Sequence, residues 1–249
     1  MELLLYIYVA LLGLVVGSFL NVCILRIPKG ESIVTTPSHC FTCKKPLRWW
    51  ELIPVFSWLC LRGKCARCKT KISPQYPIIE ATNCLLWLLV YYIHGMTLDT
   101  ILGCLLTSAL LVLSVIDART REIPIQLSAF VAILGLIRFL LHIENWQSHL
   151  LGLLVVAGFL YLLLVLSHGA AIGGGDVKLM AGSGLYLGLT PNLLAFFLGC
   201  TVGSIIHIIR MRFFGAARDL AMGPYLAVGI FISMLIGDDL INWYISLLC

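Results

Sequence analysis

Long apolar stretches separated by short polar segments dominate this 249-residue chain. A helix needs about 20 predominantly apolar residues to cross a bilayer. Eight segments reach or approach this length, and we predict that each forms a transmembrane helix: 3–25, 78–94, 98–116, 123–142, 148–168, 177–190, 192–210 and 222–246. The sixth of these is short for a full span. The pattern predicts an all-α polytopic membrane protein with about eight transmembrane helices.

The composition agrees with this fold class. Hydrophobic residues make up 60% of the chain and charged residues only 12%, whereas a soluble domain carries about 25% charged residues. A soluble globular protein is therefore excluded. The first apolar segment is not a cleaved signal peptide, because no basic residue precedes it and Arg26 follows it.

The basic residues predict the orientation. With both termini outside, the cytoplasmic segments are 26–77, 117–122, 169–176 and 211–221, and 16 of the 17 Lys and Arg residues lie in or beside them. Lys and Arg favour the cytoplasmic side of membrane proteins. The exception, Arg138, is one turn from an external helix end, where its side chain can reach the interface. Because the net charge of +5 is concentrated at one membrane face, we expect lipid and no nucleic acid as its partner.

Three regions follow from this topology: a first helix at 1–25, a polar cytoplasmic loop at 26–77, and a membrane core at 78–249. The loop contains two Cys-x-x-Cys pairs, Cys40 with Cys43 and Cys65 with Cys68, separated by 21 residues. This spacing is typical of zinc sites, and four thiolates form a closed, structural site without an open position for catalysis. Redox dithiols are the alternative interpretation, although a cytosolic location disfavours stable disulfides.

Two aspartates stand at the cytoplasmic ends of predicted spans. Asp117 closes the third span, and Asp176 follows three glycines and opens the sixth. Ionisable residues in spans are costly and mark functional sites by default. If the two carboxyl groups meet, they share a proton, and the pair can activate a water and polarise a peptide carbonyl. A flexible turn capped by Asp176 is the alternative for this second segment.

The helix ends suggest which carboxyl group holds the proton. Asp176 opens a helix, where the macrodipole favours an anion, whereas Asp117 closes one, where the dipole disfavours it. We therefore predict Asp176 as the base and Asp117 as the protonated partner. Glycine permits close backbone approach, so we expect a substrate strand to run past Gly173, Gly174 and Gly175, with Lys178 near a carboxylate or a lipid phosphate.

Several segments together resemble the type IV prepilin peptidases, a family of intramembrane aspartic peptidases. The resemblance covers about residues 17–185. The matching segments occur in the same order as in the family. They are Gly17-Ser18-Phe19-Leu20-Asn21-Val22 with Arg26 and Pro28, the two cysteine pairs, Tyr76-Pro77-Ile78-Ile79-Glu80, Asp117 with Ile123-Pro124, and Gly173 through Leu179.

This resemblance implies a multi-pass enzyme of the bacterial cytoplasmic membrane that cuts the short basic leader from type IV prepilins or pseudopilins. Such proteins build type IV pili and serve protein secretion and competence. It implies Asp117 and Asp176 as the catalytic pair, a structural Zn²⁺ on the four cysteines, and cleavage at the cytoplasmic face. Many members also methylate the new N-terminus with S-adenosylmethionine, and we predict that Glu80 and Asn21 take part in that step.

The first cysteine pair lacks the proline, and the segment after Glu80 lacks the glycine, that the family commonly has there. Two other function classes compete with the peptidase. A non-enzymatic membrane scaffold with a zinc loop explains the cysteines and the spans, but not two acidic groups at one membrane face. A proton-coupled transporter explains intramembrane carboxylates, although these lie at helix ends and no repeated halves are apparent.

Overall fold

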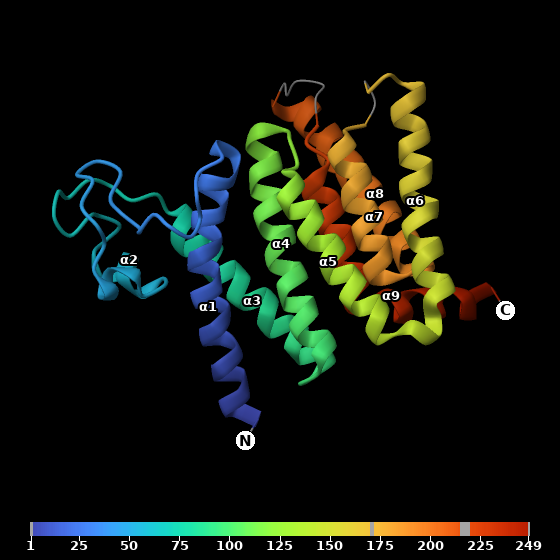
Figure 1. The fold of residues 1–249 in the computed structure, drawn as a ribbon, viewed down its shortest axis with the longest axis horizontal. Coiled ribbons are helices and arrows are strands. Elements are labelled where there is room, and N and C mark those ends of the chain that lie inside the picture. Colours follow the sequence, from blue (N-terminus) through green and yellow to red (C-terminus); the bar gives the residue numbers. More distant parts are fainter. Residues whose placement is uncertain (1, 170–171, 215–219, 249) are drawn as a thin grey trace. The chain divides into compact units, whose positions relative to one another are not determined.

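The computed structural model describes residues 2–169, 172–214 and 220–248, and almost all regular structure in them is helical (Figure 1). No β-strand forms within these ranges. The chain divides into two compact units, Met1–Thr100 and Ile101–Cys249. Each unit contains one of the two groups of residues that the sequence singles out.

In the first unit, two long helices enclose a loop with short helical turns. These elements are α1 (Glu2–Arg26), η1 (Ile27–Lys29), η2 (Trp49–Leu52), α2 (Phe56–Cys60) and α3 (Gln75–His94). The helices α1 and α3 pack against each other. A Cβ atom on Gly17 would lie 2.7 Å from the Cα of Glu80, and one on Gly13 would lie 2.9 Å from the Cα of Cys84. Small residues four positions apart let membrane helices approach closely, so the glycines of the N-terminal signature bring α1 to the backbone of α3.

The second unit is a helical bundle around one central helix. Its elements are α4 (Leu98–Thr120), which begins just before the unit boundary, α5 (Ile125–Leu141), η3 (Ile143–Asn145), α6 (Trp146–Leu166), α7 (Gly174–Leu187), α8 (Leu189–Phe214) and α9 (Gly223–Leu248). The short helix α7 contacts α5, α6, α8 and α9. Its side chains Leu179 and Met180 are fully buried. Neighbouring helices therefore surround α7, which lies between α5, α6 and α8 in Figure 1.

All eight predicted spans are helical, which confirms the all-α fold class. Six helices in the described ranges are long and apolar enough to cross a membrane, while α5 is a shorter apolar helix of 17 residues. The helix α7 has only 14 residues and is about 21 Å long, as expected from the short sixth segment. Parts of the predicted cytoplasmic segments, residues 170–171 and 215–219, lie outside the described residues.

The C-terminal end of α7 exposes backbone carbonyls that two side chains from neighbouring helices cover. Arg138 of α5 donates a hydrogen bond to the Tyr186 carbonyl at 2.7 Å, and its guanidinium lies over the Tyr186 ring. The ring Nδ1 of His149 in α6 lies 2.8 Å from the Leu185 carbonyl. The last carbonyls of a helix have no partner inside the helix. From its position in the sequence, Arg138 was expected only to reach the membrane interface. In the structure it also binds the end of α7.

Replacing Arg138 by leucine is expected to lower the free energy of unfolding by about 1–3 kcal/mol, because the Tyr186 carbonyl would lose its charged donor in a buried setting. Thermal unfolding in detergent measures this change. Arg212→Leu, at an exposed position of α8, is the matched control and should leave the unfolding temperature nearly unchanged. Equal losses in both variants would contradict a specific role for Arg138.

Candidate functional site

Asp117 lies in the last turn of α4 and is almost fully buried, with 4% of its surface exposed. Its Oδ2 atom accepts a hydrogen bond from the backbone N–H of Gly223, at 2.9 Å. Gly223 is the first residue of α9. A Cβ atom at this position would lie 2.7 Å from the same oxygen, so only glycine lets the start of α9 meet the carboxyl group at this distance.

Asp176 lies in the first turn of α7, directly after the glycines. A Cβ atom on Gly175 would lie 2.7 Å from the Cβ of Ile123, whereas one on Gly174 would meet no atom within 4 Å. Gly173 and Gly174 are exposed. The glycine run therefore has two physical roles: Gly175 packs the start of α7 against the segment after α4, and the first two glycines leave the backbone beside Asp176 open.

The two carboxyl groups act on each other electrostatically. Asp117 comes from the end of α4 and Asp176 from the start of α7, so the second unit brings them within electrostatic range of each other although 58 residues separate them. Two carboxylates at close range do not readily ionise together, and such a pair holds one proton between them. Carboxyl pairs that share a proton can activate a water molecule for attack on a carbonyl.

The predicted metal ligands form a second cluster, in the first unit. The sulfur atoms of Cys40, Cys43, Cys65 and Cys68 all lie within 4.8 Å of one another, and those of Cys40 and Cys68 are 3.7 Å apart. A tetrahedral ion with metal–sulfur bonds of about 2.3 Å requires sulfur atoms about 3.8 Å apart. The four thiols therefore fit a single tetrahedral metal ion.

Each cysteine pair sits in the same kind of turn. Lys44 donates its backbone N–H to the Cys40 carbonyl, and Lys69 donates to the Cys65 carbonyl. Both lysines have φ of 58°, a left-handed conformation that few side chains favour. Hydrogen bonds with Thr70 are the main cause that lowers the pKa of the Cys68 thiol to about 6. The lower pKa favours the thiolate, which is the form that binds metals.

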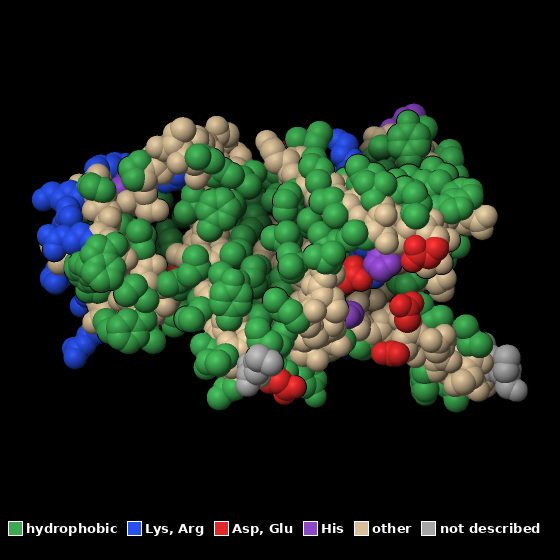
Figure 2. Space-filling model, turned by 60° about the horizontal axis from the view of Figure 1, so that its bottom comes forward, with side chains coloured by type: hydrophobic (Ala, Val, Ile, Leu, Met, Phe, Trp, Pro, Cys, Tyr) green, Lys and Arg blue, Asp and Glu red, His purple; other side chains and the backbone are tan. Residues whose placement is uncertain are grey.

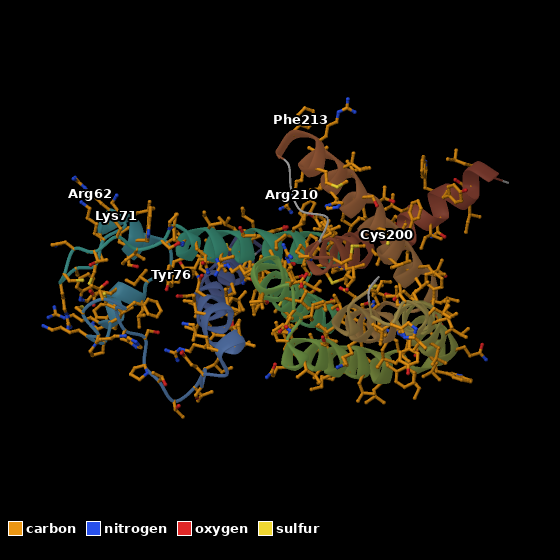
Figure 3. The ribbon with its side chains drawn as sticks, turned by 90° about the horizontal axis from the view of Figure 1, so that it is seen from above. Arg62, Lys71, Tyr76, Cys200, Arg210 and Phe213 are labelled. Carbon is orange, nitrogen blue, oxygen red and sulfur yellow. The ribbon has the colours of Figure 1, made fainter. Side chains whose placement is uncertain are left out.

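A cavity of about 650 Å³ lies between the loop and the two long helices of the first unit, and cysteines of both pairs line it. Ligand sites typically occupy about 300–1,000 Å³. Its wall includes the ring of Tyr76 near the start of α3 and charged residues of both signs, which are Glu31, Glu51, Glu80, Arg26, Lys29, Lys44 and Lys71. Figure 3 labels Tyr76 beside the loop, and it labels Arg62 and Lys71 within the loop.

Glu80 is held from two sides. Its Oε2 atom accepts the backbone N–H of Val55 at 2.6 Å, and its carboxylate also interacts with the side chain of Ser18 in α1. Val55 has φ of 59° and ψ of −54°, and Phe56 donates to the Pro54 carbonyl. This is a classic γ-turn, a rare and strained conformation, and it turns the Val55 N–H toward Glu80.

Each of the two units matches a model of a known protein family. The family model described as "Bacterial Peptidase A24 N-terminal domain" matches residues 11–94, and the one described as "Type IV leader peptidase family" matches residues 104–208. A protein of Neisseria gonorrhoeae is 34% identical, with 95% of this chain and 93% of that protein covered. The chain belongs to the type IV leader peptidase family.

Relatives in this family from Bacillus subtilis and Pseudomonas aeruginosa are each 32% identical. The alignments cover 94% and 95% of this chain, and 96% and 92% of those proteins. All three relatives are named prepilin leader peptidase/N-methyltransferase. No solved structure matches this chain significantly. The resemblance inferred from the sequence segments is thereby confirmed at the level of the family.

The structure brings some predicted site residues of this family member together and separates others. Asp117 and Asp176 lie within electrostatic range of each other, and the four cysteines converge. Glu80 lines the cavity, whereas Asn21 donates to the Tyr76 carbonyl and accepts a hydrogen bond from Gln75. Asn21 thus joins α1 to α3, and its part in methyl transfer stays a prediction. Lys178 is exposed, and its part in substrate approach stays a prediction as well.

Two contacts were missed by sequence reasoning. Gly223 lies beyond the part of the chain that the family models match. The signal for it was Gly223-Pro224, because proline favours the first turn of a helix and the predicted topology places this helix start at the same membrane face as the aspartates. Val55 carried no signal, because a strained turn at a β-branched residue is not expected from sequence.

The contact with Gly223 also removes the helix-dipole argument that predicted Asp117 as the protonated partner. The sequence places Asp117 at a helix C-terminus only, but the fold adds the N-terminus of α9, which stabilises an anion. Asp176 lies at the N-terminus of α7. Since both carboxyl groups now face a helix N-terminus, the dipole argument no longer separates their roles.

Proposed function

We propose that this chain is an aspartic endopeptidase that removes the short basic leader peptide from type IV prepilins or pseudopilins. The electrostatic interaction between the Asp117 and Asp176 carboxyl groups, at the ends of α4 and α7, carries the proposal. Membership of the family supports the substrate class, because the relatives are named prepilin leader peptidases. It also favours a peptidase over a transporter or a scaffold.

The proposed reaction uses the two carboxyl groups as one unit that holds a single proton. The ionised carboxylate takes a proton from a water molecule, and the water oxygen attacks the carbonyl carbon of the scissile peptide. The protonated carboxyl group donates its proton to the carbonyl oxygen, and proton return to the amide nitrogen then releases the two fragments. The Gly223 N–H holds the Asp117 carboxyl group in place throughout.

The exposed backbone at Gly173 and Gly174 supports the approach of an extended substrate beside Asp176. We place cleavage at the cytoplasmic face of the bacterial inner membrane, with both termini outside. The excess of Lys and Arg in the segments beside the aspartates and in the cysteine loop supports this orientation. A basic leader would then remain in the cytoplasm while the apolar helix of the substrate stays in the bilayer.

The purified chain in phospholipid vesicles, incubated with a full-length prepilin, tests this function. Mass spectrometry should find a new N-terminus at the junction of the basic leader and the apolar helix. An uncleaved prepilin in the presence of folded, membrane-inserted protein would overturn the proposal. A prepilin with its basic leader already removed is the matched control and should be unchanged.

A second activity, methylation of the new N-terminus, is favoured by the cavity next to Glu80. Its volume suits a nucleoside-sized ligand, and S-adenosylmethionine would supply an electrophilic methyl group there. The buried carboxylate of Glu80 can complement a sulfonium charge, and the Tyr76 ring can stack on it. Glu80, held by Val55 and Ser18, is the group we expect to orient the amine that receives the methyl group.

We propose Zn²⁺ as the ion of the four-cysteine cluster, because it suits four thiolates in tetrahedral geometry. The described part of the loop has few buried apolar side chains, so metal binding would contribute directly to its folding. The ion would hold the two turns together, and with them the wall of the cavity.

Removal of the metal should therefore affect the two activities differently. Cys65→Ser is expected to abolish bound zinc and methyl transfer, because Cys65 is buried and lines the cavity, while leader cleavage by the second unit persists. Zinc content by elemental analysis, together with separate assays of cleavage and methylation, measures this. Cys60→Ser, at an exposed cysteine outside the cluster, is the control and should change none of the three. Loss of cleavage in parallel with methylation would contradict the separation.

A further inference from the structure

The loop of the first unit carries an apolar surface that the metal site does not use. Residues 49–60, which we call the apolar hairpin, comprise η2, the γ-turn at Val55 and α2. Several large apolar side chains of this hairpin point outward, with exposed fractions of 79% for Trp49, 63% for Phe56 and 59% for Leu59. Leu52 and Ile53 are also exposed. Contiguous apolar surface of this kind marks an interaction site.

The depth of the hairpin along the membrane helices follows from its contacts. Val55 binds Glu80, which is the sixth residue of α3 and lies about 7.5 Å along the helix from its start. Glu80 also interacts with Ser18, which is eight residues, or about 12 Å, before the end of α1 at Arg26. The hairpin therefore lies beside the apolar helices of its unit rather than beyond their ends, as α2 does in Figure 1.

The hairpin has a fixed orientation within the loop. The indole N–H of Trp58 donates to the Ile72 carbonyl at 3.2 Å, and the Trp58 ring packs on Gly63. Trp58 thus faces inward and joins the hairpin to the second cysteine turn. The side chains of Trp49, Phe56 and Leu59 are consequently held on the outer side.

Charge indicates what covers this surface. Segment 26–77 contains ten Lys and Arg residues and only two Glu. Arg48, Arg62 and Lys64 flank the hairpin in the sequence and are exposed. Figure 2 shows Lys and Arg next to hydrophobic side chains on the surface of this loop. Exposed aromatic and aliphatic groups beside basic ones are typical of elements that lie in the interface of an anionic membrane.

We propose that the apolar hairpin is an interfacial anchor, which inserts Trp49, Phe56 and Leu59 into the leaflet of anionic phospholipids next to the metal loop. The flanking basic side chains contact lipid phosphates. Leu52, Ser57 and Trp58 of the hairpin also line the 650 Å³ cavity. Anchoring therefore holds that cavity at the depth where a polypeptide leaves the bilayer.

Fluorescence quenching in proteoliposomes tests this anchor. The full-length protein is reconstituted in vesicles of phosphatidylglycerol and phosphatidylethanolamine that contain lipids brominated on the acyl chains. The difference in emission between the wild type and Trp49→Phe isolates Trp49. Most of the Trp49 emission should be quenched, with a shift of the remaining emission to shorter wavelength.

The matched control carries Trp49→Phe together with Val34→Trp. Val34 is 84% exposed in the same loop, next to the residues whose carbonyls bind Arg26 at the end of α1, so a tryptophan there should remain unquenched. Equal quenching at both positions, or none at Trp49, would overturn the proposal. Trp49 emission that shifts only with increasing protein concentration would assign the surface to a second copy of the chain and overturn it as well.

A variant without the apolar surface gives an independent measurement. Phe56→Asp combined with Leu59→Asp changes two exposed side chains, so bound metal should be retained while Trp49 quenching by brominated lipid is lost. Val34→Asp should leave the quenching unchanged. Full quenching of Trp49 in the double variant would show that the hairpin does not insert through these side chains.

Discussion

Replacing either Asp117 or Asp176 by asparagine is expected to lower kcat for leader cleavage by about 10²–10⁴-fold, with little change in KM. Asparagine has nearly the same shape as aspartate but neither accepts nor donates the catalytic proton. Because the two groups hold one proton as a unit, the double variant should be little worse than either single variant. Cleavage rates measured with a purified prepilin in vesicles provide the comparison.

Asp239→Asn is the control for these variants, because Asp239 is an exposed aspartate of α9 in the same unit. It should cleave at the wild-type rate. Zinc content should be intact in all three single variants, and so should methyl transfer to a pilin whose leader has already been removed, since the cysteines and the cavity belong to the first unit. Normal processing by the Asp117 or the Asp176 variant would refute the two-carboxyl mechanism. It would leave the proposed leader cleavage itself intact.

Gly223→Ala should lower kcat by about 10²-fold, because the added methyl group pushes the Asp117 carboxyl group out of position. Small misplacements of reacting groups reduce the rate by about this factor. The new Cβ would lie 2.7 Å from Asp117 Oδ2 and 3.1 Å from its Cγ. Gly223 is a positioning residue, so KM should stay constant. The pH profile of kcat should shift, because the ionised Asp117 carboxyl group loses the hydrogen bond from the Gly223 N–H.

A glycine away from the site provides the control for this substitution. Gly158→Ala is within α6, and a Cβ at this position would meet no atom within 4 Å. Alanine is favoured over glycine in helices by about 1 kcal/mol, so lost helix stability would not explain reduced activity. If Gly223→Ala keeps the wild-type kcat and pH profile, the start of α9 does not position Asp117.

Each part of the protein shows a different limit of sequence reasoning. The zinc-type cysteine pairs were predictable because each pair is a local turn with a known spacing, and their convergence requires only that the loop close on itself. The glycines before Asp176 were visible, but their separate roles were not. Gly175 packs on Ile123 while Gly174 remains open, and that difference depends on which helix lies opposite each residue.

The apolar hairpin and Arg138 illustrate the same limit on surfaces. Trp49 and Trp58 look alike in the sequence, yet Trp49 is exposed and Trp58 binds the Ile72 carbonyl. Arg138 is the single basic residue away from the predicted cytoplasmic segments, and only the fold reveals the helix end that it covers. In both cases a side chain's role is set by a partner far along the chain.

The sequence by itself determined the helical membrane fold and the eight helical segments, and it singled out the four cysteines that cluster and the two aspartates. Those features follow from hydropathy, charge and spacing, which are properties of neighbouring residues. Only the tertiary structure decided that α7 is the central helix, that Glu80 binds the strained turn at Val55, and that Gly223 meets Asp117 across 106 residues. Such contacts depend on how helices pack, because packing brings together side chains that no local pattern relates.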